Sequence, residues 1–291
     1  MHVILGGTGH IGSALAHALL EQGEAVTVVT RTPSKASDLE RKGARVATAD
    51  VNNTEALRNV IGQGERLFLL NPPADPSMDF DAEERKTIAA MLAALDGTNL
   101  EKIVAASTYG AQSGDHMGDL GSLYEMEQAL AKRPIPTAVV RGAFYMSNWD
   151  AQLPTARDNE TLYTFFPPDF EVPMVDPGDI GKLAAELMTE PATATGLYHV
   201  EGPARYASND VASAFSRALD KPVAAIQIPQ DQWLHAFKTL GFSDKASVSF
   251  SNMFAATLAG QFPSPDVARR GTTSLEDYVS NLVAQSAPGP A

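Results

Sequence analysis

The sequence predicts an α/β fold in which helices cover both faces of a doubly wound parallel sheet. Strand-like and helix-like segments alternate over residues 2–202. The chain opens with a short apolar run, followed at once by glycines and then by an amphipathic helical pattern. With 44% hydrophobic residues in a chain of 291, it can also bury a large core. Alternation of this kind produces parallel strands joined by helical crossovers.

The opening segment carries the clearest signal. Gly6, Gly9 and Gly12 are spaced GxxGxxG directly after the apolar residues 2–5. The residues that continue at helical spacing are Ala14, Leu15, Ala18 and Leu19. A strand, a tight glycine turn and a helix N-terminus form a cradle for the pyrophosphate of a dinucleotide, as in Rossmann-like folds. The alternative is an ordinary strand-to-helix turn, since glycine serves there too.

Further elements follow in the same alternation. The segments expected to be strands are residues 25–31, 44–51, 66–71, 102–108, 137–142 and 197–202. The segments expected to be helices are residues 33–43, 54–61, 80–95, 122–132 and 179–190. Counting the opening strand, the sequence predicts seven parallel strands.

The alternation breaks at two places in the second half of the chain. Residues 163–179 are rich in Pro and aromatics, and residues 207–261 lack the strand–helix rhythm. We therefore predict a Rossmann-like domain over residues 1–150, to which a helix and a strand near 178–202 return. Residues 151–291 would mainly form a smaller C-terminal substrate lobe, with a flexible tail at 285–291. Length alone also allows one large α/β unit.

Composition excludes several classes of function. The net charge is −13 and there is no basic run, which argues against nucleic acid binding. The chain has no cysteine, so disulfides, thiolate metal sites and thiol nucleophiles are excluded. Its six histidines lack metal-site spacing, and no GxSxG hydrolase elbow occurs. With no signal-like segment and no apolar stretch of membrane length, we expect a cytoplasmic protein that does not bind membranes.

The end of the second strand predicts the cofactor. At this position an acidic residue favours NAD, and a basic residue accommodates the 2′-phosphate of NADP. The chain has Thr30 and then Arg31, with Lys35 one turn further on. The sequence therefore favours NADP(H) over NAD(H). The alternative is that Arg31 and Lys35 are a solvated surface pair.

Other candidates for cofactor binding follow the third, fourth and fifth strands. Carboxyl ends of parallel strands meet at one edge of the sheet, where ligands bind. The candidates at these ends are Asp50, Val51, Leu70, Asn71, Pro72, Ser107 and Thr108. For Asp50 the alternative is a solvent-facing loop residue, and for the hydroxyl groups it is capping of the strand end.

The usual catalytic pair of short-chain reductases is missing. That pair is a Tyr acid with a Lys four residues on, whose ammonium lowers the phenol pKa. None of the seven tyrosines has a lysine at that spacing, and Tyr124, in the expected helix, has Gln128 instead. Tyr124 and Tyr109 are the candidate proton donors, with packing as the alternative for Tyr124. Glu127, on the same helix, fits a surface charge.

Four segments carry a resemblance to a known family: GGTGHIG, VTRTPSKA, residues 122–149 and residues 179–203. They resemble the NmrA-like, atypical branch of short-chain reductases, which includes NADPH-dependent quinone reductases and non-catalytic redox-sensing regulators. In that family the helix commonly carries a Glu where Glu127 stands, and the next strand ends in Arg, here Arg141.

The resemblance implies roles for individual positions. The loop residues that would hold the pyrophosphate are Gly6, Thr8, Gly9, His10, Ile11 and Gly12. Arg31 would reach the 2′-phosphate, and the nicotinamide would be bordered by Gly142, Ala143 and Phe144. The substrate pocket would be lined by Tyr145, Asn148 and Trp149. Phe144 and Trp149 fit equally well as core residues.

Two functions from different classes follow. The first is an NADPH-dependent reductase of a small apolar quinone or carbonyl compound. A quinone suits the missing Lys, because its reduced anion resembles a phenolate of pKa about 10 and needs no strong acid. The second is a non-catalytic NADP(H)-sensing regulator that acts through a protein partner. An epimerase on the same fold is a third possibility, and a homodimer is also compatible with the sequence.

Overall fold

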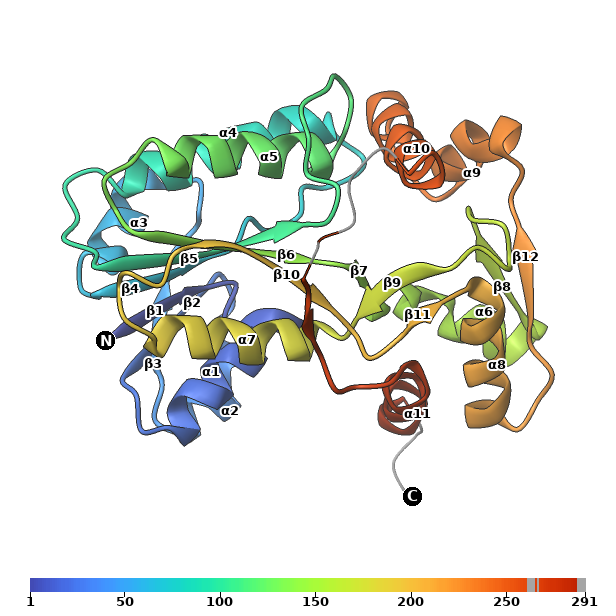
Figure 1. Cartoon of the computed structure of the whole chain (residues 1–291), viewed down its shortest axis with the longest axis horizontal. Coiled ribbons are helices and arrows are strands. Elements are labelled where there is room, and N and C mark those ends of the chain that lie inside the picture. Colours follow the sequence, from blue (N-terminus) through green and yellow to red (C-terminus); the bar gives the residue numbers. More distant parts are fainter. Residues whose placement is uncertain (261–264, 266, 287–291) are drawn as a thin grey trace.

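The computed structural model describes residues 1–260, 265 and 267–286, and it is built around one large parallel sheet (Figure 1). The strand order is β13-β10-β6-β5-β4-β1-β2-β3, and every neighbouring pair is parallel. The strands are β1 His2–Leu5, β2 Val26–Thr30, β3 Arg45–Thr48, β4 Arg66–Leu69, β5 Lys102–Thr108, β6 Thr137–Gly142, β10 Gly196–Glu201 and β13 Arg269–Arg270. The predicted α/β fold class is confirmed, and the two-residue β13 is an eighth strand that the sequence pattern did not indicate.

Helices cover both faces of this sheet. Those on one face are α1 His10–Glu21, α2 Ser37–Arg41 and α7 Pro177–Thr189 (Figure 1). Those on the other face are α3 Thr54–Ile61, α4 Phe80–Ala94 and α5 Asp119–Ala131. α5 begins three residues before the predicted start, and residues 33–36 form a 3-10 turn, η1, ahead of α2. All seven predicted strands and all six predicted helices, counting the helix that follows the glycine loop, are present at these places in the chain.

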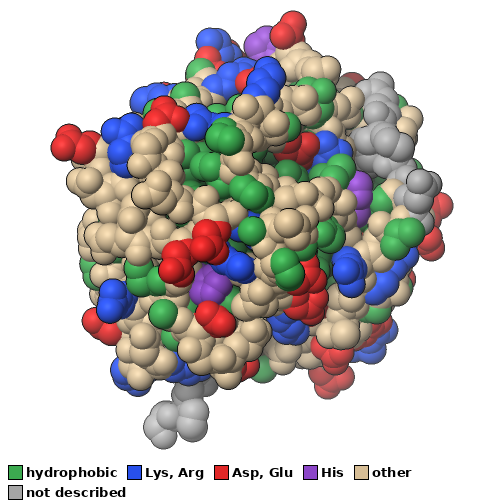
Figure 2. All heavy atoms as spheres, turned by 60° about the vertical axis from the view of Figure 1, so that its left-hand side comes forward, with side chains coloured by type: hydrophobic (Ala, Val, Ile, Leu, Met, Phe, Trp, Pro, Cys, Tyr) green, Lys and Arg blue, Asp and Glu red, His purple; other side chains and the backbone are tan. Residues whose placement is uncertain are grey.

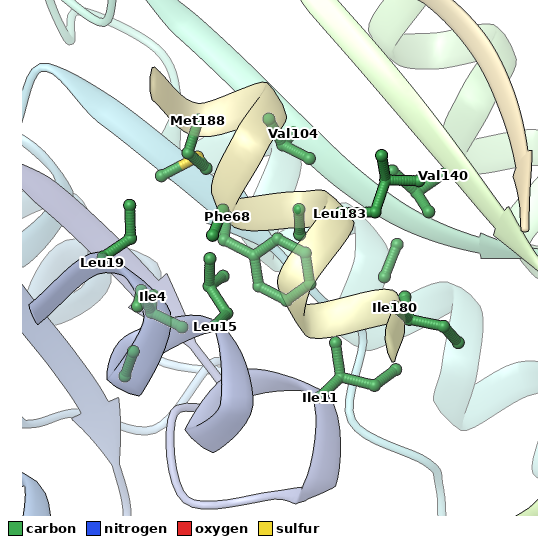
Figure 3. Close-up of a cluster of buried hydrophobic side chains, with 14 of the residues drawn as sticks. Ile4, Ile11, Leu15, Leu19, Phe68, Val104, Val140, Ile180, Leu183 and Met188 are labelled. Carbon is green, nitrogen blue, oxygen red and sulfur yellow. The ribbon is translucent and has the colours of Figure 1, made fainter. Parts of the chain in front are cut away.

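The core on the α1 and α7 side is built around Phe68 of β4 (Figure 3). Its ring is fully buried between Leu15 of α1 and Leu183 of α7. The two helices touch closely at Gly181, where a Cβ atom would lie 2.6 Å from the Ile11 carbonyl oxygen. Since backbone cannot yield cheaply to such a contact, Gly181 sets the distance of α1 from α7.

A second group of elements lies beyond the carboxyl ends of β5 and β6 (Figure 1). Two small sheets contain β7 Phe144–Tyr145, β8 Thr161–Thr164, β9 Val172–Val175, β11 Arg205–Tyr206 and β12 Ala224–Gln227. The helical elements are η2 Met146–Gln152, α6 Leu153–Asn159, α8 Ser208–Leu219, η3 Gln230–Gln232, α9 Trp233–Thr239, α10 Asp244–Leu258 and α11 Leu275–Gln285. They enclose a core of their own, with Trp149, Leu162 and Phe215 among its buried residues.

The boundaries proposed for the two domains stay a prediction. The segment after residue 207 is not confined to this second group of elements. The ring of Phe250 in α10 packs edge to face on that of Phe80 in α4, with the ring centroids 5.1 Å apart. Of the predicted tail, Gln285 is the last residue of α11, and residues 287–291 lie outside the described part of the chain.

The surface carries charges of both signs. Figure 2 shows Lys and Arg scattered among Asp and Glu on one face of the molecule. Within the described residues, no helix has the length and apolar character needed to cross a bilayer. The expectation that the protein binds no nucleic acid stays a prediction.

Candidate functional site

The predicted cofactor-binding residues lie at or after the carboxyl ends of the strands of the large sheet. The strands β2 and β3 lie on one side of β1, and β4, the next strand in sequence, lies on the other side of it. The order of strands therefore changes direction at β1. In open α/β sheets the crevice outside such a switch point is where ligands bind. The Gly-rich loop leaves β1 at this position and leads directly into α1.

The loop is shaped by missing side chains. Gly6 adopts φ +66°, which favours glycine, and its carbonyl accepts a hydrogen bond of 2.9 Å from the Gly9 N–H. A Cβ at Gly12 would lie 2.3 Å from the same carbonyl oxygen, whereas a Cβ at Gly9 would meet only that atom, at 3.4 Å. Gly12 thus allows the close approach of α1 to β1, and Gly9 is exposed at the mouth.

The start of α1 fits an anionic ligand. Gly9 is its N-cap, and among the described residues no side chain caps the first turn. Free N–H groups at a helix N-terminus attract phosphate. His10 and Thr8 flank the mouth, and Ile11 is buried beneath it. These residues fit the pyrophosphate of a dinucleotide.

The end of β2 is tied to this loop. The Thr8 and Thr30 hydroxyl oxygens lie 3.3 Å apart, and Thr30 Oγ1 accepts a hydrogen bond of 3.1 Å from the Thr32 N–H. The exposed Arg31 therefore leaves the sheet next to the glycine loop, with exposed Lys35 in η1 beyond it. The predicted role of Arg31 at a 2′-phosphate stays a prediction.

The ends of β3 and β4 are more constrained than the sequence indicates. The exposed Asp50 carboxylate accepts a hydrogen bond of 2.9 Å from the Asn52 N–H and so shapes its own loop, while Val51 packs on the core. A Cβ atom at Gly6 would lie 3.0 Å from the side chain of Leu70, so Leu70 lies directly beside the glycine loop.

Asn71 and the half-buried Pro72 follow on this edge, and Asn71 is held by a buried acid that the sequence did not suggest. Its amide donates to the carboxylate of Glu84, which is 1% exposed and also accepts a hydrogen bond of 2.8 Å from the Ala74 N–H. Burial, together with the charge of Asp119, raises the pKa of Glu84 to about 8. Glu84 is therefore protonated at neutral pH when folded.

The end of β5 contains a buried ion-pair network. The Ser107 hydroxyl donates to Glu127, which pairs with the Arg141 guanidinium through contacts of 2.9 and 2.6 Å. Glu127 is 8% exposed, so it is no surface charge. The signal for this was its place in an apolar stripe with Leu123 and Leu130 on the inner face of α5.

Tyr109 belongs to a second network. Its hydroxyl donates to Glu201 Oε1 at 3.2 Å, and Glu201 Oε2 lies 2.7 Å from the Arg270 guanidinium on β13. Burial and the Glu201 charge raise the pKa of Tyr109, which makes this phenol a weaker acid. Thr108 is half-buried nearby, and its hydroxyl donates to the Tyr109 carbonyl at 3.3 Å.

Tyr124 lies away from these networks. It lines a shallow surface hollow of about 500 Å³ on α5, together with Gln128 and Lys132. This position favours the packing alternative over proton donation, and the catalytic role stays a prediction.

The chain after β6 places Tyr145 at the edge. A Cβ at the buried Gly142 would lie 2.8 Å from the Tyr145 ring and 3.5 Å from its hydroxyl oxygen, so Tyr145 lies directly over the end of β6. Burial and the Asp119 charge raise the pKa of Tyr145. Ala143 is buried, and its N–H donates to the Val200 carbonyl at 3.0 Å.

The other predicted substrate residues divide between core and surface. Trp149 is 5% exposed and packs with Phe144 at a ring distance of 6.1 Å, which favours the core alternative. Phe144 is half-buried, and Asn148 is exposed.

Comparison with known proteins decides the family. The model of the NmrA-like family matches residues 2–267. The chain belongs to the NmrA-like family. The predicted resemblance is thereby confirmed.

The relatives that match this chain have names that describe different functions. An NAD(P)H azoreductase from Xenophilus azovorans is 24% identical over 256 residues, which cover 88% of this chain and 86% of the relative. A nitrogen metabolite regulation-like protein from Gibberella fujikuroi is 23% identical, with 94% and 90% covered. The NADPH complex of an Escherichia coli NADPH-dependent quinone oxidoreductase superimposes with TM-score 0.72 at 22% identity, over 97% of this chain and 99% of that one. This likeness shows the shared fold.

The two glycines of the loop should respond differently to alanine. In Gly12→Ala the new Cβ meets backbone, so we expect a loss of about 1–3 kcal/mol in the free energy of unfolding. In Gly9→Ala the Cβ has room, so stability should change by less than about 0.5 kcal/mol while NADPH affinity falls, because the methyl group occupies the mouth. Urea unfolding and calorimetric titration measure the two effects. Equal destabilisation by both variants would contradict this account of the loop.

Glu84 should make stability depend on pH. Its pKa is raised on folding, so its stabilising contribution is complete below about pH 4 and is lost as pH rises through about 8, by about 1.4 kcal/mol per pH unit between. Glu84→Gln is always neutral, so its free energy of unfolding relative to wild type should rise from pH 6 to pH 8. Glu83→Gln, a half-exposed neighbour paired with Lys86, is the control. A pH-independent difference for Glu84→Gln would show that the acid is ionised in the folded protein.

Proposed function

We propose that the protein is an NADPH-dependent oxidoreductase that reduces a small apolar quinone or carbonyl compound. The observation that carries the proposal is the uncapped start of α1 over a glycine-rich loop, at the switch point of the sheet. Relatives named as an NAD(P)H azoreductase and an NADPH-dependent quinone oxidoreductase support it.

The chain supplies distinct groups for each part of the cofactor. The loop from Gly6 to Gly12 would bind the pyrophosphate, and Arg31 with Lys35 would meet the 2′-phosphate. An arginine beside phosphate forms charge-assisted hydrogen bonds, which supports NADP(H) over NAD(H). Asp50 and Val51 would lie at the adenine, while the segment from Gly142 to Phe144 and the ends of β4 and β5 would border the nicotinamide. Bound NADPH supplies a hydride to the acceptor.

The hydroxyl groups that β5 presents at this edge are not free to donate a proton to the reduced product. Ser107 and Tyr109 already donate to Glu127 and Glu201, which leaves these hydroxyls committed to carboxylates. Tyr145 at the end of β6 is the hydroxyl best placed to hydrogen-bond a reduced oxygen, and Asn148 lies exposed on the turn after it. A quinone suits such a site, because a hydroquinone anion has a pKa near that of a phenol, about 10, and can take its proton from water.

A second candidate function is the NADP(H)-sensing regulator. It is favoured by the relative named as a nitrogen metabolite regulation-like protein and by the absence of a Tyr–Lys pair in the sequence. In this case the cofactor would be bound and not consumed, and a protein partner would respond to its occupancy.

One series of measurements tests the function. Calorimetric titration should show NADPH binding more tightly than NADH, and Arg31→Ala should weaken NADPH binding by about tenfold while leaving NADH unchanged. Arg41→Ala, an exposed arginine of α2 paired with Asp38, is the matched control. Purified protein should then consume NADPH faster than background with a panel of quinones and aldehydes.

Each failure has its own meaning. Equal affinity for NADH and NADPH would overturn the cofactor preference. Binding of NADPH without turnover on the panel would overturn the reductase and favour the regulator.

A further inference from the structure

The helix α10 is fastened to two loops that lead from the proposed site into α4 and α5. The first loop follows β4 and spans residues 70–79, and the second follows β5 and spans residues 109–118. Loops at the carboxyl ends of parallel strands form the rim of the ligand crevice. The contacts of α10 therefore act on the rim of the proposed site.

The start of α10 holds the first loop. Ser243, the N-cap of α10, donates from its N–H to the Pro76 carbonyl at 2.8 Å and from its hydroxyl to the Met78 carbonyl at 2.6 Å. Lys245, in the first turn, pairs with Asp79 at 2.6 Å. Backbone of the first loop is thus bonded directly to the beginning of the helix.

The middle of α10 holds the second loop. The Asn252 side-chain amide donates a hydrogen bond of 3.0 Å to the His116 carbonyl. A Cβ atom at Gly118 would lie 2.8 Å from Met253 Sδ, so the helix also packs directly on the loop. His116 and Gly118 both have φ of 52°, in the left-handed region that favours glycine. A histidine stays in this conformation only where its surroundings hold it, and the bond from Asn252 is one such restraint.

The same helix also reaches the core of the second group of elements. The ring of Phe254 in α10 lies 5.0 Å from that of Phe166, which in turn lies 5.9 Å from that of Phe144. Phe144 begins β7 and is proposed to border the nicotinamide. On its other side α10 lies beside α4 (Figure 1), where Phe250 packs on Phe80. α10 therefore spans the distance between the rim loops and the aromatic side chains around Phe144.

The second loop ends close to the acceptor side of the proposed site. Asp119 directly follows Gly118 as the first residue of α5. Burial and the charge of Asp119 raise the pKa of Tyr145, the hydroxyl proposed to meet the reduced oxygen. A shift of the second loop would thus change the surroundings of this hydroxyl.

We infer that α10 is a positioning element that sets the width of the proposed acceptor site, with Ser243 and Asn252 as the residues that hold its rim. The inference rests on the proposed function. One helix is fixed to both rim loops and to the aromatic core behind Phe144, so it determines how far the loops lie from that side chain. While both loops are held, the site accepts a small ring, and a released loop admits a larger one.

The first test measures the second loop itself. Asn252→Ala removes the donor to the His116 carbonyl at a position inside the helix, where alanine is well tolerated. Amide hydrogen exchange over residues 110–118 should become about fivefold faster, as expected for the loss of one hydrogen bond. Asn281→Ala, at an exposed position inside α11, is the matched control and should leave this exchange unchanged. Unchanged exchange in Asn252→Ala would show that α10 does not hold the loop, which overturns the inference.

The second test measures acceptor selectivity with benzoquinone, which has one ring, and phenanthrenequinone, which has three fused rings. In Asn252→Ala the ratio of kcat/KM for phenanthrenequinone to that for benzoquinone should rise about fivefold, through a lower KM for the larger acceptor. The Kd for NADPH should stay unchanged in calorimetric titration. A general loss of stability would lower kcat for both acceptors alike and leave the ratio unchanged. Differences in the intrinsic reactivity of the two quinones are the same for all variants and cancel.

Substitutions of Ser243 separate its contact with the first loop from its role as a cap. The Ser243 hydroxyl oxygen also accepts a hydrogen bond of 3.1 Å from the Ala246 N–H. Ser243→Asp keeps an acceptor for this cap but cannot donate to the Met78 carbonyl, so it should change the selectivity in the same direction as Asn252→Ala. Ser243→Thr keeps both functions and should behave as wild type.

The outcomes separate this inference from the proposed function. If wild type binds NADPH but reduces neither quinone, the reductase is wrong and this inference falls with it. If wild type reduces both quinones, and Asn252→Ala and Ser243→Asp keep its selectivity, the role of α10 is overturned while the proposed function stands.

Discussion

The close approach of Gly12 to Gly6 is the constraint on which the rest of the site depends. Because Gly12 has no Cβ, α1 starts directly over the end of β1. The N–H of Gly9, the N-cap of α1, donates a hydrogen bond to the Gly6 carbonyl. Gly181 then sets the distance of the same helix from α7, and Phe68 fills the space that this leaves. Glycine inside a helix costs about 0.5–1 kcal/mol relative to alanine. Glycine is nevertheless needed at both positions. A side chain at Gly12 would push α1 away from the Gly6 backbone, and one at Gly181 would push α1 away from α7.

Two ion pairs, each with a buried glutamate, organise the other half of the carboxyl edge. Glu127 with Arg141, and Glu201 with Arg270, receive the hydroxyls that β5 presents there. Such pairs seldom add net stability, since desolvation offsets most of the attraction, but losing one partner is costly. They connect the end of β5 to α5 and β6 and to β10 and β13, and they engage the Ser107 and Tyr109 hydroxyls. For the proposed reductase, an acceptor whose reduced form is a stable anion would suit hydroxyls that are already engaged in this way better than a ketone would.

The sequence predicted the sheet because its evidence is local. Apolar runs and helical spacing recur every few residues, and they placed all seven strands that carry such a pattern. β13 escaped prediction because two exposed arginines have no pattern, and their pairing with β10 depends on a fold that brings residues 200 and 269 together. Glu201 escaped prediction for the same reason, because the Tyr109 hydroxyl from which it accepts a hydrogen bond is 92 residues away in sequence. The glycine loop, whose partners are its own neighbours, was the part of the site most open to prediction.

A chain of net charge −13 must still attract a ligand that is itself anionic. Salt screens exposed charges beyond about 8–10 Å, so the total charge matters less than the few groups beside the phosphates. The basic residues beside the glycine loop are Arg31, which follows β2, and Lys35 of η1. Both side chains are exposed, and the contact of Thr8 with Thr30 places the end of β2 next to the loop. Under the proposed function, these two basic side chains would therefore offset the net negative charge where the phosphates of the ligand bind, and the N-terminus of α1 would add its N–H groups.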